Sequence, residues 1–278
     1  MPILLRNILL GLEEPEERLP ELAAKRLGVA VDAVRNYAVV RRSMDARRRR
    51  GIHFAYHLEV ALDEPPERER ARLRRCRPNE AAWIDVEVPV EPAAGTCPMR
   101  HRPCIVGSGP AGMFAALRLA QFGYRPIVLE RGRPVRRRHR DVLQRFYRHR
   151  DFDPDSNLLF GEGGAGTYSD GKLYTRVSDP LVETVLETFF HHGADPEILV
   201  NARPHIGSDM LPTICTRIRR RIESLGGDVR FECHMLDIRI EETSGGATES
   251  APPLRGAGSE TPAAGGGGAT TGARGRVT

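Results

Sequence analysis

The stretch "CIVGSGPAGMFAALRLAQFGYRPIVLE", residues 104–130, constrains the fold of this chain more than any other part of the sequence. Its first three residues are apolar and predict a short strand, and residues 110–122 carry apolar side chains at helical spacing. Gly123 marks the expected end of that helix, and residues 125–130 predict a second strand. A strand, a glycine-rich turn, a helix and another strand in this order predict a β-α-β unit in a parallel sheet.

The turn contains Gly107, Gly109 and Gly112 in the pattern G-x-G-x-x-G, and Glu130 follows 18 residues after the last glycine. The pattern is weak evidence alone, but between a strand and a helix it is typical of dinucleotide binding. The three glycines would allow the tight turn, the approach of a pyrophosphate and close helix packing, and the helix N-terminus would attract the phosphates. Glu130 can accept hydrogen bonds from ribose hydroxyls and would repel a 2′-phosphate, which favours FAD or NAD over NADP. The expected contact residues are Gly107, Ser108, Gly109, Pro110, Ala111, Gly112 and Glu130.

A second glycine-rich run, "FGEGGAGTYSDGKL", spans residues 160–173 and holds five glycines. Glycine loses more conformational entropy on folding than any other residue, so its concentrated use indicates a close backbone approach or positive φ angles. A flexible linker is the alternative interpretation.

The first part of the chain predicts a different unit. Residues 3–12 form an apolar run, residues 13–28 have helical spacing that ends at a glycine, and residues 33–45 and 52–62 are rich in β-forming side chains. This β-α-β-β order predicts a small α+β domain of ferredoxin-like kind. Residues 64–82 are charged and partly helical, and the proline-rich stretch 86–103 resembles a linker. The expected domains are therefore 1–96, 97–242 and a low-complexity, disordered tail at 243–278.

Farther along, Asp179 caps a predicted helix over 179–193, residues 198–207 read as a strand followed by a loop, and residues 208–227 predict another helix. Residues 228–242 predict a long, partly alternating strand.

Composition restricts the class of protein. The formal net charge is +5, and of the 42 basic residues only Lys25 and Lys172 are lysines, a bias that indicates a GC-rich coding sequence. The arginine cluster at 41–50 predicts a solvated hairpin tip. RNA binding is the alternative, since Tyr37, Phe54 and Tyr56 lie nearby, but the exposed aromatic motif typical of RNA-binding sheets is not evident. Five scattered cysteines favour a reducing cytoplasm and argue against a metal site.

No stretch has the pattern of a signal peptide or a membrane span. The expected partner is a small-molecule substrate, with neither a membrane nor nucleic acid.

Four segments together, "IVGSGPAGMFAALRLAQFGYRPIVLERG", "DPDSNLLFGEGGAGTYSDGKLYTR", "ARPHIGSD" and "IESLGGDVRF", resemble the bacterial-type, largely uncharacterised FAD-dependent dehydrogenases among the glutathione-reductase-like flavoproteins. "KRLGV" and "RRSMDARRRRGIHFAYHLEV" are similar to the small N-terminal domain of that family, so the resemblance covers residues 1 to about 241.

The resemblance implies an oxidoreductase with a Rossmann-like FAD-binding domain and with NAD(P)H as a candidate electron donor. It also implies that the second glycine run contacts the flavin, that Arg131 and Arg138 meet the phosphates, and that His205 is a candidate redox-site residue. A solvated helix face for Arg138 and a structural loop role for His205 are the alternatives, and no catalytic residue is assigned. Members of that family continue well beyond this length, so we expect a fragment. The further expected contact residues are Gly163, Gly164, Ala165, Gly166 and Thr167, flanked by Ser169 and Asp170, and Met235 on a strand beside the adenine.

Overall fold

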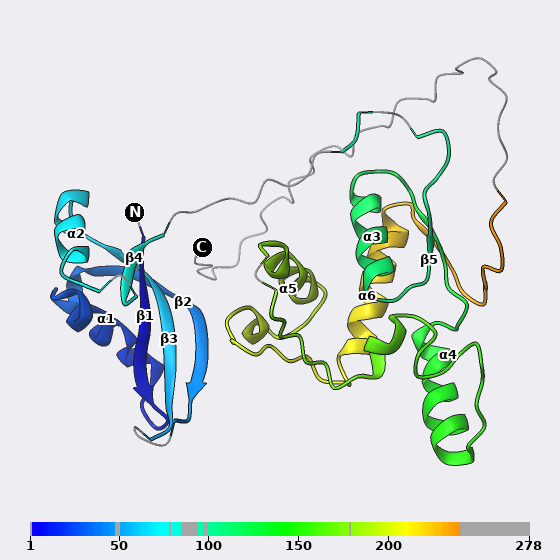
Figure 1. Cartoon of the computed structure of the whole chain (residues 1–278), viewed down its shortest axis with the longest axis horizontal. Helices are drawn as coiled ribbons and strands as arrows, with labels where there is room; N and C mark the ends of the chain where they lie inside the picture. Colours follow the sequence, from blue (N-terminus) through cyan, green and yellow to red (C-terminus); the bar gives the residue numbers. More distant parts are fainter. Residues whose placement is uncertain are drawn as a thin grey trace, which may run out of the picture.

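The chain is a mixed α/β protein with one antiparallel and one parallel sheet (Figure 1). The computed structural model describes residues 2–47, 51–77, 79–84, 94–96, 99–177 and 179–239. Two clusters of buried apolar residues form separate cores, the first from residues before position 84 and the second from residues after position 104.

The N-terminal unit is a four-stranded antiparallel sheet in the order β2-β3-β1-β4, with helices packed on one face. Leu58 and Val60 of the central strand β3 are fully buried and pack in the same core as the first helix, while Glu59 between them is partly exposed. Gly28 ends the first helix in the left-handed conformation, with φ +65°, as expected. The elements are β1 (Ile3–Gly11), η1 (Glu16–Arg18), α1 (Leu19–Leu27), η2 (Val31–Ala33), β2 (Val34–Asp45), β3 (His53–Leu62), α2 (Pro66–Leu73) and β4 (Ala81–Trp83).

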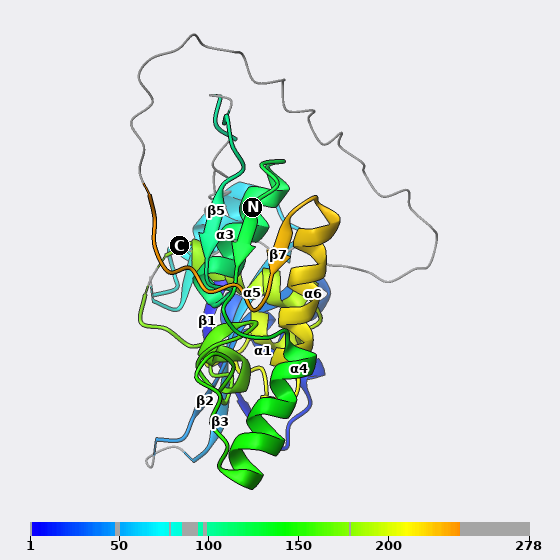
Figure 2. The same cartoon turned by 90° about the vertical axis from the view of Figure 1, so that its right-hand side faces the viewer.

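The second unit contains a three-stranded parallel sheet in the order β5-β6-β7. Helices α3 and α6 pack together and supply most of its buried apolar side chains, and both lie beside the sheet in Figure 2. Its elements are β5 (Cys104–Val106), α3 (Pro110–Gln121), β6 (Ile127–Leu129), α4 (Val135–Arg140), the π-helical η3 (Asp141–Arg148), η4 (Gly164–Tyr168), α5 (Leu181–His191), η5 (Pro196–Leu199), α6 (Leu211–Ser224) and β7 (Asp228–Arg230). The side chain of Asp179 accepts a hydrogen bond from Leu181 N (2.8 Å), so it caps α5 as predicted.

Two strand predictions are wrong. Residues 196–199 form the 3-10 helix η5, and the strand predicted over 228–242 ends at Arg230 within the described residues. The alternating pattern after Arg230 has no described strand beside it, and Leu236 and Ile238 are 86% and 68% exposed. Without a sheet to cover, alternation alone does not make a strand. Residues 240–242 and the predicted tail 243–278 lie outside the described part of the chain.

The two units touch at the edge of strand β2. Arg42 N donates to Val200 O (2.7 Å), and Ala202 N donates to Arg42 O (2.8 Å), so residues 200–202 extend the edge of the first sheet. The Arg42 guanidinium reinforces this contact through an ion pair with Glu197 (2.9 Å) and a hydrogen bond to Asn201 Oδ1 (3.1 Å), and it also pairs with Glu16 of its own unit.

Candidate functional site

The first glycine turn folds as a tight connection between β5 and α3. Gly107 has φ +91° and donates its N–H to Leu129 O (2.8 Å), which ties the turn to the neighbouring strand. A Cβ at Gly112 would lie 2.0 Å from Gly107 O, so only glycine lets the helix pack this close to the turn.

The N-terminus of α3 has free backbone donors. Gly109 precedes the helix and Pro110 is its first residue, where the missing N–H of proline costs nothing. Among the described residues, none accepts a hydrogen bond from the N–H of Ala111 or Gly112. These N–H groups and the positive end of the helix dipole can therefore bind an anion.

The second glycine run folds back onto the first. Gly163 N donates to Ser108 O (2.9 Å), and a Cβ at Gly164 would lie 2.9 Å from the Cα of Gly109. Gly163 and Gly164 both have positive φ, +81° and +63°. The run is therefore ordered by close backbone contact with the first turn, and the linker interpretation is wrong for residues 161–168.

A mostly apolar cavity of about 490 Å³ opens beside this contact. Phe114 and Phe189 lie on one side of it, and Ser169 and Lys172 supply polar groups. Five predicted contact residues line the cavity: Pro110, Ala111, Gly163, Gly166 and Thr167. The other predicted residues of the two runs, Gly107, Ser108, Gly109, Gly112, Gly164 and Ala165, belong to the same loops without lining it.

Glu130 lies directly after β6 and is buried. One carboxylate oxygen accepts from Ser108 N and Ser108 Oγ (both 2.8 Å), and the other accepts from Gly132 N (2.8 Å) and Gly161 N (3.0 Å). Burial alone would raise the pKa of Glu130, but these four hydrogen bonds outweigh it and hold the pKa below its usual value. Glu130 therefore joins three loops, and it does not form an exposed pair with Arg131.

Arg131 lies at the same edge and stacks its guanidinium on the Phe160 ring, 3.6 Å from the centroid. It also donates to Pro154 O (2.7 Å). The phosphate contact of Arg131 stays a prediction.

Arg138 is fully buried, so neither a phosphate contact nor a solvated helix face describes it. Its guanidinium donates to the main-chain oxygens of Asn157, Leu158 and Glu162 at 2.7–3.0 Å. Burial lowers its pKa, and no described carboxylate lies within ion-pair distance of its guanidinium. Arg138 therefore holds the backbone that leads into the second glycine run.

Glu162 completes the support of the run. Its buried carboxylate accepts from Arg219 Nε (2.8 Å) and Val135 N (2.7 Å), and its main-chain oxygen accepts from Thr167 Oγ1 (2.8 Å). Arg138, Glu162 and Arg219 were not identified as supports from the sequence. The sequence offered one signal of their role: Glu162 lies within the segment 153–176 that resembles the family, and Arg219 lies three residues before the segment 222–231.

The remaining predicted residues are dispersed. Met235 lies outside any strand and is half-buried, so the predicted strand position beside an adenine is wrong. His205 is exposed, and its backbone pairs with Lys172, which places the "SDGKL" and "RPHIG" motifs side by side. Lys172 itself pairs with Asp170 (2.7 Å).

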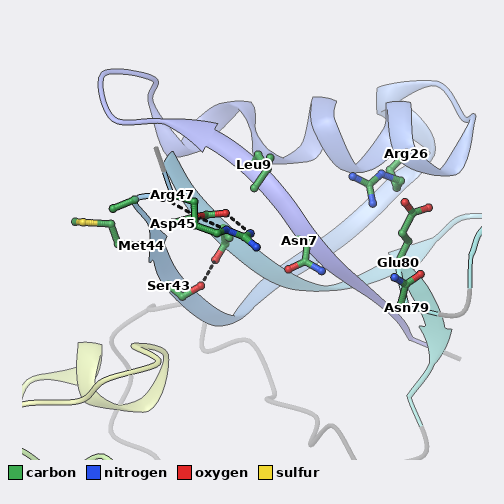
Figure 3. A pocket seen from close by; sticks show the side chains of 11 residues that line it. Asn7, Leu9, Arg26, Ser43, Met44, Asp45, Arg47, Asn79 and Glu80 are labelled. Atoms are coloured by element: carbon green, nitrogen blue, oxygen red, sulfur yellow. Dashed lines mark hydrogen bonds and ion pairs between the residues drawn. The ribbon is translucent and has the colours of Figure 1, made fainter. Parts of the chain in front are cut away.

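A larger hollow, about 810 Å³, lies on the sheet of the N-terminal unit and contains none of the predicted cofactor contacts (Figure 3). Arg26 and Glu80 lie at one end, and Asp45 and Arg47 pair with each other at the other end. Residues 48–50 of the predicted arginine cluster lie outside the described part of the chain.

Two further findings concern the described residues only. No set of three or more histidine, cysteine or acidic side chains is grouped so that it could hold a metal ion. None of the described helices combines the length and the apolar character needed to span a membrane.

Comparison with known proteins gives two similarities. Residues 2–61 match the model of a family described as a domain of unknown function, DUF8436. The chain is also 34% identical over 242 residues to an uncharacterized protein of Clostridium beijerinckii, a match that covers 87% of this chain and 44% of that relative. The chain therefore spans less than half the length of the relative.

Proposed function

We propose that the second unit is a Rossmann-like FAD-binding domain and that the chain is part of an FAD-dependent oxidoreductase. The observation that carries the proposal is the contact between the two glycine runs, where Gly164 packs on Gly109 at the open N-terminus of α3. A glycine turn between a strand and a helix is common, but a second glycine loop held against it beside an apolar cavity fits a flat ligand with a phosphate group.

The residues present fit such a cofactor. The free N–H groups of Ala111 and Gly112 would bind the pyrophosphate, and no atom lies within 4 Å of the position of a Cβ at Gly107. Glu130 already accepts four hydrogen bonds, so a ribose hydroxyl would take the place of the Ser108 hydroxyl, which can rotate away. Hydride transfer through the flavin N5 is the chemistry that bound FAD supplies, and a small-molecule substrate and NAD(P)H are the proposed reaction partners.

The topology supports the finer description of both units. A parallel β5-α3-β6 unit with β7 added beside β6 is the order of one half of a doubly wound fold. The antiparallel order β2-β3-β1-β4 with the element order β-α-β-β-α-β is that of a ferredoxin-like domain. Four free cysteines among the described residues support the proposed cytoplasmic location.

A charge at the helix N-terminus tests the proposal. Ala111 is exposed and lines the cavity, so Ala111→Glu places a carboxylate where the pyrophosphate would bind. The helix dipole stabilises a carboxylate at this end of the helix, so we expect the variant to fold. Repulsion of about 1–4 kcal/mol at 4 Å lowers FAD affinity at least about fivefold.

The matched control is Ala115→Glu, which adds the same charge at an exposed position one turn farther along α3. We expect the control to bind FAD within about twofold of the wild type. Equal FAD affinity for both variants and the wild type would contradict the proposal. Mass spectrometry of the extracted cofactor distinguishes FAD from NAD.

A further inference from the structure

One projecting element of the second unit carries a local excess of positive charge. Residues 133–153, here called the helical arm, contain α4, η3 and the turn that follows, and they extend away from the rest of the second unit in both views (Figures 1 and 2). The arm carries eight arginines and three aspartates, an excess of five that equals the formal net charge of +5 for the whole chain. Residues 41–50 carry the same excess, with six arginines and one aspartate, but three of those arginines lie outside the described residues.

Half of the arm's arginines are already paired or buried. Arg133, Arg137 and Arg145 form ion pairs with carboxylates, and Arg138 is in the interior. Among the described residues, no carboxylate lies within ion-pair distance of the four others, Arg136, Arg140, Arg148 and Arg150.

Two of the unpaired arginines lie close together on α4. Arg136 and Arg140 are four residues apart, and like charges at this spacing repel each other on a helix. Together with the paired Arg137, and with His139 and Gln144, they line a hollow of about 490 Å³. Planar guanidinium groups bind phosphate oxygens through two parallel hydrogen bonds, so a phosphate in this hollow would relieve the repulsion.

Aromatic rings are exposed on the same arm. Tyr147 and Phe152 are 53% and 57% exposed, and both pack edge-on against Phe146, which fixes their orientation. Exposed rings next to phosphate-binding arginines are the combination that binds unpaired bases by stacking. A membrane surface fits less well, because an interfacial helix needs a continuous apolar face, and Leu143 and Tyr147 are flanked by Arg140 and Arg148.

We propose that the helical arm binds unpaired RNA, with Arg136, Arg140 and Arg148 on the phosphates and Tyr147 and Phe152 against the bases. This site differs from the arginine cluster at 41–50, which the sequence alone suggested as the place for an RNA contact. It also revises the expectation that nucleic acid is not a partner, because that expectation rested on the N-terminal cluster.

Fluorescence anisotropy with a labelled oligouridylate of about 12 nucleotides tests the proposal. The triple variant Arg136→Gln, Arg140→Gln and Arg148→Gln should lose most of the affinity, and the slope of log Kd against log salt should fall by about 2. Tyr147→Ala should weaken binding roughly tenfold without a change in that slope. Circular dichroism and FAD content should match the wild type, because the substituted side chains are exposed and lie outside the candidate cofactor site.

The control is the triple variant Arg74→Gln, Arg75→Gln and Arg77→Gln, which removes the same charge from exposed positions of the N-terminal unit. We expect it to bind the oligonucleotide within about threefold of the wild type. If both triple variants lose affinity equally, net charge alone would explain the binding, and the proposal would be overturned. Absence of binding at low salt, loss of binding through Arg47→Gln alone, or binding to phosphatidylserine vesicles without RNA binding would each overturn it as well.

Discussion

The two units of the described chain have different kinds of interior. In residues 2–84 the buried side chains are apolar, and Glu69 is the one buried polar residue among those described. In residues 99–239 an apolar core of helices lies beside a group of buried polar residues. All of them fall between positions 108 and 167: Ser108, Glu130, Arg138, Asp141, Ser156, Asn157, Glu162 and Thr167.

The difference shows how each unit is specified. Apolar burial is not directional, so an alternating pattern is sufficient to fold the first sheet. A buried polar group must find its partners or lose stability, so the network fixes the glycine loops in one arrangement. The candidate cofactor site therefore lies on the part of the molecule that is least tolerant of change.

Arg138→Met should have the largest effect, about 4 kcal/mol, because it leaves three main-chain oxygens without donors in the interior. Hydrogen–deuterium exchange of peptides from residues 156–168 should accelerate strongly. Fluorescence of Trp83, the single tryptophan of the chain and a residue of β4, should report an unchanged midpoint for the N-terminal unit. The control is Arg136→Met on the exposed side of the same helix; if its exchange rates match those of Arg138→Met, the network does not hold the loop.

Leu58→Ala is the corresponding change in the N-terminal unit. Leu58 is fully buried in the first core, and its truncation should cost about 3 kcal/mol through lost apolar burial and the cavity that remains. The urea concentration at the midpoint of unfolding, followed by Trp83 fluorescence, should fall in this variant. Hydrogen–deuterium exchange of peptides from residues 156–168 should stay as in the wild type. A shift of both signals would show that the two units unfold together.

Glu130→Gln should destabilise the second unit by about 2 kcal/mol at pH 7, since one amide cannot accept the four hydrogen bonds of the carboxylate. The pKa of Glu130 is lower in the folded than in the unfolded chain, so its contribution is complete above the unfolded pKa of about 4.3. The contribution is lost as the pH falls through the folded value. The stability difference between wild type and variant should therefore shrink below about pH 4, and a difference independent of pH would show that the carboxylate charge is irrelevant.

Arg42→Ala should have the smallest effect. Its partners Glu16 and Glu197 are 51% and 58% exposed, so loss of these pairs should cost at most about 1 kcal/mol. The backbone hydrogen bonds to residues 200 and 202 remain. Exchange of peptides around residues 197–202 should rise modestly, with both unfolding midpoints unchanged; a large shift in either midpoint would mean that the side chain, and not the backbone, joins the units.

The sequence by itself determined the strands and helices with a regular pattern of side chains, and the glycine residues that end or connect them. Strands β1, β2 and β3 follow from an apolar run and from β-forming side chains, and α3 and α6 follow from helical spacing that ends at glycine. Gly107 and Gly112 were recognisable because few other residues allow a positive φ or so close an approach. These features depend on residues a few positions apart in the chain, so they can be recognised in the sequence.

Only the tertiary structure decided which groups meet across long distances in the chain. Arg138 and Glu162 look like surface charges in the sequence, yet both are buried, because partners 19 to 57 residues away satisfy them. The same holds for residues 228–242, whose alternation needs a neighbouring strand that the described chain does not supply beyond Arg230. Hydrogen bonds and sheet pairing require a partner at a fixed distance and direction, and that partner is chosen by the fold rather than by the local sequence.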